Sequence, residues 1–174
     1  DHDEELAKFD NERVQDIVVR DLAENRSRFI KPWKPDYADF PVWKAVVASS
    51  SVPTYFPIVE GRYVDGGLGS YSNPCYVAAF EATKCLKWDP KDTTLISVGA
   101  GRTIDPLKPH EADGYISIQW ISPLLDTFLD SANDQQVGVV KELFTALDFR
   151  RFQINVPPIA MDDVSKMDEL TEYG

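Results

Sequence analysis

The chain has 174 residues, a hydrophobic content of 43% and a formal net charge of −11. The acidic balance argues against nucleic acid as a partner and against strong attraction to anionic lipid surfaces. The length allows one domain, residues 1–174, and no run resembles a membrane span. The first residue is Asp1 rather than Met, so we expect the true N-terminus to lie upstream. The sequence does not determine the cellular compartment, and the cytoplasm is favoured.

The N-terminal region is predicted to be a helical lead-in, residues 1–28. An acidic run at residues 1–5 is expected to be a solvated end. Apolar residues over 6–22 recur at helical spacing, with an interruption near Asp10. Residues 29–39 contain two prolines and aromatic side chains, which predicts a strand end and an irregular loop.

A helix, a serine-rich turn and a hairpin are predicted next. Pro41 suits a first helical turn, where its missing N–H costs nothing. Pro53 biases Val52 away from helix, so the helix should end in the preceding serines. Two β-prone runs, residues 55–59 and 62–64, are then joined by a plausible tight turn at Glu60-Gly61.

The second β-prone run delivers Asp65 at its end, directly before Gly66 and Gly67. Glycines without a Cβ let the backbone turn sharply and let another group approach closely. Asp-Gly is also a common turn pair, and residue chemistry alone favours a hairpin corner whose Asp bonds its own backbone. Asn73 is then a good N-cap and Pro74 a good first residue for a helix over 75–86.

The next segment predicts a strand followed by a glycine-containing loop. Residues 93–98 are mostly apolar and fit a buried parallel strand. Gly99 to Gly101 resembles a phosphate loop, but the third glycine and the acidic residue of a dinucleotide fingerprint are missing, which disfavours a nucleotide binder. His110 is compatible with a Ser-His-Asp triad or with an exposed loop residue, and the same two interpretations apply to His2.

Two helical patterns follow, over residues 114–130 and 137–147, and they are expected to form a helical hairpin. The first is interpreted as a helix packed on the sheet; the functional alternatives are the wall of a ligand groove or an interaction surface. Residues 152–156 predict a strand.

The remaining chemistry-bearing residues predict no metal and no cofactor. Cys75 and Cys85 lie on one predicted helix, face apart and exceed disulfide reach, so we expect both to be reduced. Asp162 and Asp163 are interpreted as a cap for a helix over 165–170 rather than as a metal site.

Several motifs together resemble the patatin-like phospholipases. The central ones are a small-residue and serine run ending in a Pro-x-x-Phe-Pro-like segment, a strand ending in Asp-Gly-Gly, and Ser-Asn-Pro. The resemblance covers roughly residue 29 to the end, and its motifs agree in order and spacing. They are Ala48 to Pro57, Tyr63 to Leu68, Ser72 to Pro74, Leu95 to Gly101, Phe149 to Gln153, and Met161 to Ser165 with Met167 to Leu170.

The resemblance implies a three-layer α/β/α sandwich and a Ser–Asp catalytic dyad without histidine. By position in the motif, Asp65 is then the catalytic aspartate, and Gly66 and Gly67 form the motif around it. The implied reaction is acyl transfer to water on a lipid or acyl ester, with possible peripheral membrane contact.

The chain departs from the family because it contains no Gly-x-Ser-x-Gly. Ser70, Ser72 and Ser97 lack flanking glycines at the required spacing, and the glycine-rich oxyanion loop is missing. We therefore expect this to be the C-terminal half of a patatin-like domain, inactive alone, with its sheet completed by the N-terminal half as a fragment or another chain. The alternative is a non-catalytic binding or regulatory module that kept the scaffold.

Overall fold

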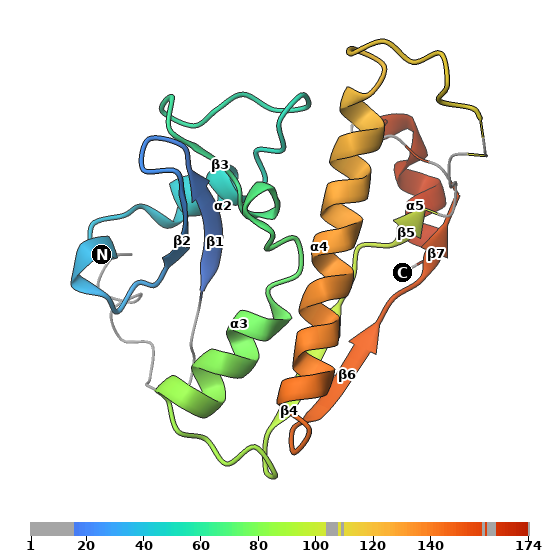
Figure 1. The fold of residues 1–174 in the computed structure, drawn as a ribbon. Coiled ribbons are helices and arrows are strands. Elements are labelled where there is room, and N and C mark those ends of the chain that lie inside the picture. Colours follow the sequence, from blue (N-terminus) through green and yellow to red (C-terminus); the bar gives the residue numbers. More distant parts are fainter. Residues whose placement is uncertain (1–15, 104–107, 109, 158, 160–162, 174) are drawn as a thin grey trace. The chain divides into compact units, whose positions relative to one another are not determined.

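The structure, a computed structural model, describes residues 16–103, 108, 110–157, 159 and 163–173. The chain divides between Ser72 and Asn73 into two compact units, each built around its own core (Figure 1). Helices and small sheets alternate along the sequence, so the chain is a mixed α/β protein as predicted. The strands form three small sheets, and the three-layer sandwich remains a prediction.

The first unit contains a three-stranded antiparallel sheet in the order β2-β1-β3. Its strands are β1 (Ile17–Asp21), β2 (Arg26–Ile30) and β3 (Tyr63–Asp65). The helix predicted over residues 6–22 is wrong where the structure describes it, because residues 17–21 form β1; residues 6–15 lie outside the described part. Three consecutive β-branched side chains begin β1, and Val19 is fully buried between β2 and β3.

Helix α2 (Val42–Ser49) packs against β1 and β3. Pro41 is the extended N-cap residue rather than part of the first helical turn, and the helix ends at Ser49, within the serines as predicted. Ala45 and Ala48 are buried, and their small side chains let α2 lie close to the sheet. The core of the unit comprises Val19, Ile30, Ala45, Ala48 and Tyr63. A short 3-10 helix, η1 (Pro35–Tyr37), lies in the loop between β2 and α2.

The tight turn predicted before β3 is confirmed. Glu60 and Gly61 have φ of 49° and 63°, and the flanking Val59 and Tyr63 exchange two backbone hydrogen bonds of 2.9 Å. The strand predicted over 55–59 is wrong, because only Val59 forms a bridge. The residues before it form turns: the N–H groups of Tyr55 and Phe56 both donate to Val52 O.

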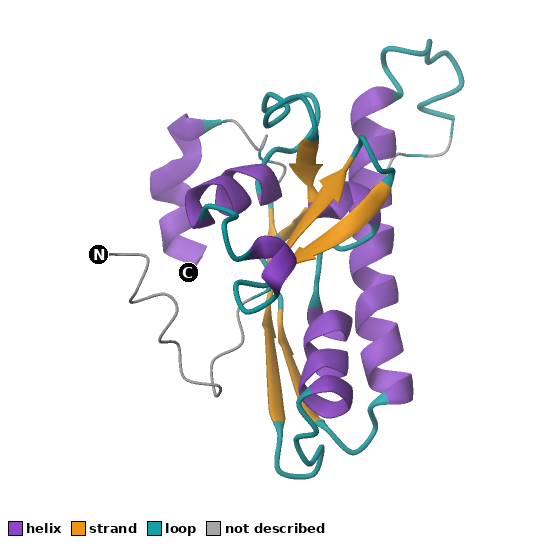
Figure 2. Cartoon of the chain, turned by 90° about the vertical axis from the view of Figure 1, so that its left-hand side faces the viewer, coloured by secondary structure: helices purple, strands orange, loops and turns teal. Residues whose placement is uncertain are grey.

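The second unit pairs its strands in parallel. Figure 2 shows the helices and strands of the chain by colour. β4 (Thr94–Val98) pairs with β6 (Asp148–Phe152), and β5 (Arg102–Thr103) pairs with β7 (Asn155–Val156). The predicted parallel strand at β4 is confirmed. The strand was expected to be buried, but only one of its faces is. Ser97 is buried, whereas Ile96 and Val98 are 59% and 75% exposed.

Helices α3 (Cys75–Phe80) and α4 (Ile121–Leu143) pack together, and α3 also contacts β4. A π-helical turn at Glu81–Cys85 extends α3 to nearly the predicted end. The helical hairpin expected over 114–147 is wrong: α4 is one helix of 23 residues, because no proline or turn-forming pair interrupts residues 131–136. The C-terminal segment forms η4 (Val164–Lys166) and α5 (Met167–Tyr173).

The core of the second unit is formed by Cys75, Ala79 and Val140, with Leu95 and Phe149 packed against it. Cys75 is buried and Cys85 exposed, and both are free, as expected. Within the described part of the chain, no helix combines the length and the apolar character needed to cross a membrane.

Candidate functional site

Asp65 lies at the end of β3, where the strand passes into the 3-10 helix η2 (Gly66–Gly69). Its backbone is fixed on two sides. It pairs with Val19 of β1, and its N–H donates to Ser51 O at 3.0 Å in the serine-rich turn after α2. The sheet and α2 therefore set the position of this carboxylate together.

The carboxylate of Asp65 caps the turn that follows it. Its Oδ1 accepts a hydrogen bond of 2.5 Å from Gly67 N–H, which is the turn-forming bond that residue chemistry predicted. Among the described residues, no serine hydroxyl donates to this carboxylate and no cation forms an ion pair with it. Its second oxygen is thus available to another proton donor.

Burial raises the pKa of Asp65 above its ordinary value, because removal from water penalises the charged form. The hydrogen bond from Gly67 N–H opposes this effect but is the smaller cause. A half-buried carboxylate with a raised pKa, and with no cation paired to it among the described residues, has the properties of a proton acceptor.

Gly66 must be a glycine because the backbone of β1 lies very close to it. A Cβ at this position would lie 2.6 Å from Val18 O, so only glycine lets η2 pack on β1. Gly66 and Gly67 are both buried. The predicted role of the glycines in close approach is confirmed for Gly66, and the approaching group is the backbone of β1.

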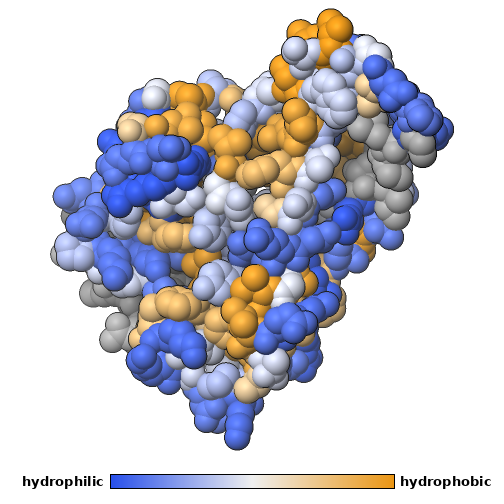
Figure 3. All heavy atoms as spheres, in the orientation of Figure 1, coloured by the Kyte–Doolittle hydropathy of each residue, from blue (hydrophilic) through white to orange (hydrophobic). Residues whose placement is uncertain are grey.

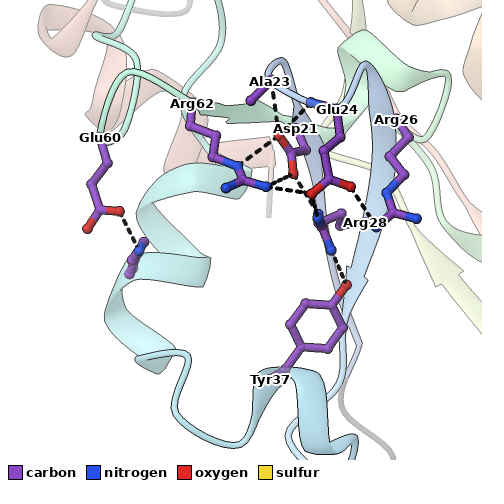
Figure 4. Close-up of polar contacts among 9 residues, drawn as sticks. Asp21, Ala23, Glu24, Arg26, Arg28, Tyr37, Glu60 and Arg62 are labelled. Atoms are coloured by element: carbon purple, nitrogen blue, oxygen red, sulfur yellow. Dashed lines mark hydrogen bonds and ion pairs between the residues drawn. The ribbon is translucent and has the colours of Figure 1, made fainter.

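Sequence reasoning missed a network of charged side chains at the other end of β1 (Figure 4). Asp21 is fully buried and accepts hydrogen bonds from Arg28 Nε at 2.6 Å and from Arg62 Nε and Nη2 at 2.9 and 2.7 Å. Glu24 pairs with the same two arginines. The alternation of acidic and basic residues across the β1–β2 turn was the signal that could have indicated it.

The arginines hold the pKa of Asp21 well below its ordinary value, with the hydrogen bond from Arg62 as the largest cause. Arg62 directly precedes β3, so this ion pair fixes the start of the strand that ends at Asp65. The network is therefore part of the scaffold of the site.

A second polar cluster lies in the second unit. It contains Asn73 and Ser97, both of which the sequence analysis considered. Asn73 Oδ1 accepts from Cys75 N–H at 3.1 Å at the start of α3, although the N-cap residue is the proline that follows rather than Asn73 as predicted, and it also accepts from Ser97 Oγ at 3.2 Å. Arg151 donates to Ser97 Oγ at 2.8 Å and to Asn133 Oδ1 at 3.1 Å. Ser97 is buried and engaged on both sides, which fits a structural hydroxyl rather than a nucleophile.

Gly99 serves the same cluster. A Cβ on Gly99 would lie 2.5 Å from Arg151 Nη2 and closer still to Gln153 Oε1. The glycine makes room for these two side chains, which gives the phosphate-like loop a packing explanation.

The histidine and aspartate positions considered for catalysis or metal binding lie apart from Asp65 in sequence. His110 is exposed and pairs with Asp113 at 2.9 Å. Asp163 caps η4 by accepting from Ser165 N–H at 3.1 Å. His2 and Asp162 lie outside the described residues. Across the described part of the chain, no cluster of three or more His, Cys, Asp or Glu side chains could hold a metal ion.

The first unit thus presents an aspartate at a strand end on a glycine-rich turn, supported by a serine-rich turn. The sequence profile of the patatin-like phospholipases matches residues 3–79, which include all of these features. The family predicted from the motifs is confirmed over this segment, which covers less than half of the chain.

The match corrects the extent of the resemblance. It begins well before residue 29 and ends at residue 79, so the motifs proposed near residues 95–101, 149–153 and 161–170 lie beyond it. None of the curated proteins compared with the chain matches it significantly.

Proposed function

We propose that this protein is a serine-dependent lipid acyl hydrolase in which Asp65 is the general base of a Ser–Asp dyad. The observation that carries the proposal is the setting of Asp65: a strand-end carboxylate inside the family match, with one oxygen on Gly67 N–H and a pKa raised by burial. Since the sequence contains no Gly-x-Ser-x-Gly, the nucleophile is proposed to come from outside these residues.

The proposed reaction proceeds in two steps. The serine Oγ attacks the ester carbonyl carbon while its proton passes to the free oxygen of Asp65, and collapse of the tetrahedral intermediate expels the alcohol, which takes that proton. Water then gives a proton to Asp65 as it attacks the acyl-serine, and the fatty acid leaves as the proton returns to the serine. Backbone donors outside the described residues would stabilise the oxyanion.

The partner that supplies the serine is proposed to cover the exposed face of the β4–β6 sheet. Parallel sheets normally have both faces covered, whereas Ile96, Val98 and Phe152 are exposed. The N-terminal half of the same domain, as a preceding segment or a separate fragment, would provide both the missing layer and the nucleophile.

Labelling with a fluorophosphonate probe, read by intact-mass spectrometry of the complete protein, tests the proposal. We expect one probe adduct on a serine outside this sequence, and much slower labelling when Asp65 is replaced by Asn. An unlabelled, folded wild-type protein would instead favour a non-catalytic binding module, the alternative that the missing serine motif supports.

A further inference from the structure

An apolar surface lies where the chain enters α4. Ile116 and Ile118 are 66% and 71% exposed, and Ile121 and Leu124 in the first turns of the helix are also exposed. We call these four residues the apolar tip. Figure 3 shows apolar side chains gathered over the segment that leads into α4. Exposed patches of this kind mark interaction surfaces more often than scattered apolar residues do.

The segment that carries the tip lacks charge. Residues 114–125 contain no charged side chain, although 27% of the chain is charged. A group that enters the apolar part of a lipid layer cannot carry charge without a large cost. The uncharged stretch therefore fits contact with hydrocarbon better than contact with a polar protein surface.

Part of the backbone of the tip is hydrogen-bonded locally. Ile116 N–H donates to Gln119 Oε1 at 2.9 Å, and Gln119 N–H donates back to Ile116 O at 2.9 Å. Leu124 N–H donates to Trp120 O at 3.0 Å. Internal pairing of this kind is what a lipid environment demands, since it offers no water to unpaired groups.

Two half-buried aromatic residues flank the isoleucines. Tyr115 and Trp120 form an edge-to-face pair with ring centroids 5.6 Å apart, and both are less exposed than the isoleucines. Tyrosine and tryptophan favour the boundary between water and hydrocarbon, because one end of each ring system is polar.

The charges around the tip select the kind of lipid. Glu111, Asp113 and Asp126 are exposed on either side of the uncharged stretch, and the chain has a net charge of −11. An anionic surface would repel this region, whereas a zwitterionic one would not.

We infer that the apolar tip inserts into the interfacial layer of zwitterionic lipid surfaces. The inference goes beyond the proposed function, because the binding would hold whether or not the protein hydrolyses the lipid. Ile116 and Ile118 supply the apolar contact, and the aromatic pair sets the depth of insertion.

Co-sedimentation of the complete protein with phosphatidylcholine vesicles tests the inference without turnover. We expect the double variant Ile116→Glu/Ile118→Glu to bind at least about tenfold more weakly than wild type, since two exposed isoleucines lose their lipid contact. Val164→Glu is the matched control, because Val164 is an equally exposed apolar residue of η4, and it should bind as wild type does. Ile118→Trp should strengthen binding, which keeps the test informative if the double variant fails to fold.

Three results would overturn the inference. The first is that the wild-type protein stays in the supernatant. The second is that the folded double variant binds vesicles as tightly as wild type. The third is that wild type binds anionic phosphatidylglycerol vesicles more tightly than phosphatidylcholine vesicles. If the double variant changes the oligomeric mass and leaves vesicle binding intact, the tip meets another copy of the chain instead of lipid.

Discussion

At the residue scale, Asp65 combines two features that a general base needs. Its position is fixed by backbone bonds to β1 and to Ser51, and burial raises its pKa. The aspartate and its glycines could be predicted from sequence because a β-prone run followed by Asp-Gly-Gly has few local structures open to it. The close packing of Gly66 against the backbone of Val18 could not be predicted from sequence. Val18 lies in β1, nearly fifty residues earlier, and the local pattern there predicted a helix.

The pH dependence of hydrolysis should report the titration of Asp65. A base acts when ionised, so kcat/KM should fall as the pH drops through its pKa, and burial places that fall above the ordinary aspartate value of 3.8. A pH–rate profile of the complete protein measures it. An acid limb at or below 3.8 would show that another group governs the rate.

Asp21 should dominate the electrostatic stability of the first unit. Its native pKa is lowered, so its contribution is present above the unfolded value of 3.8 and is lost as the pH falls from there toward the native pKa. Asp21→Asn should lower the free energy of unfolding by about 3 kcal/mol at pH 7, because two arginines lose a buried partner, and by less below pH 4. Urea titrations at both pH values measure this, with the exposed Asp39→Asn as control. An equal loss at both values would contradict the ion-pair explanation.

At the element scale, the helices and strands that were wrongly predicted are those whose conformation depends on long-range packing. The turn at Glu60-Gly61 and the end of α2 within the serines follow from backbone chemistry within a few residues, and both were predicted. β1 was missed because its apolar run also suits a helix until β2 and β3 pair with it. The single helix α4 was predicted as two because its polar central residues resemble a connection.

Two glycine-to-alanine substitutions separate packing from helix propensity. Gly66→Ala should destabilise the protein by about 2 kcal/mol or more, because its Cβ would meet the β1 backbone. Gly138→Ala, inside α4 with nothing within 4 Å of its Cβ, should stabilise by about 0.5–1 kcal/mol. Thermal unfolding measures both. A neutral Gly66→Ala would mean that η2 does not pack on β1 as described.

At the scale of the whole molecule, the β4–β6 sheet exposes Ile96 and Val98 on one face, and the covering layer proposed above is testable there. If that face is covered in the complete protein, Val98→Lys should lower its stability by about 2 kcal/mol or more, because a charge replaces a buried methyl pair. Val164→Lys serves as the control at another exposed valine. Unchanged thermal unfolding of the Val98 variant would show that the face meets water.

The most direct test of the central proposal is the rate at which the complete protein carrying Asp65→Asn hydrolyses an acyl ester. The asparagine can keep the hydrogen bond from Gly67 N–H, so the turn should persist while the proton acceptor is lost. We expect kcat to fall by about a hundredfold or more with little change in thermal stability, and Asp39→Asn to remain fully active. Near wild-type turnover by the Asp65 variant would contradict the assignment of this residue as the base.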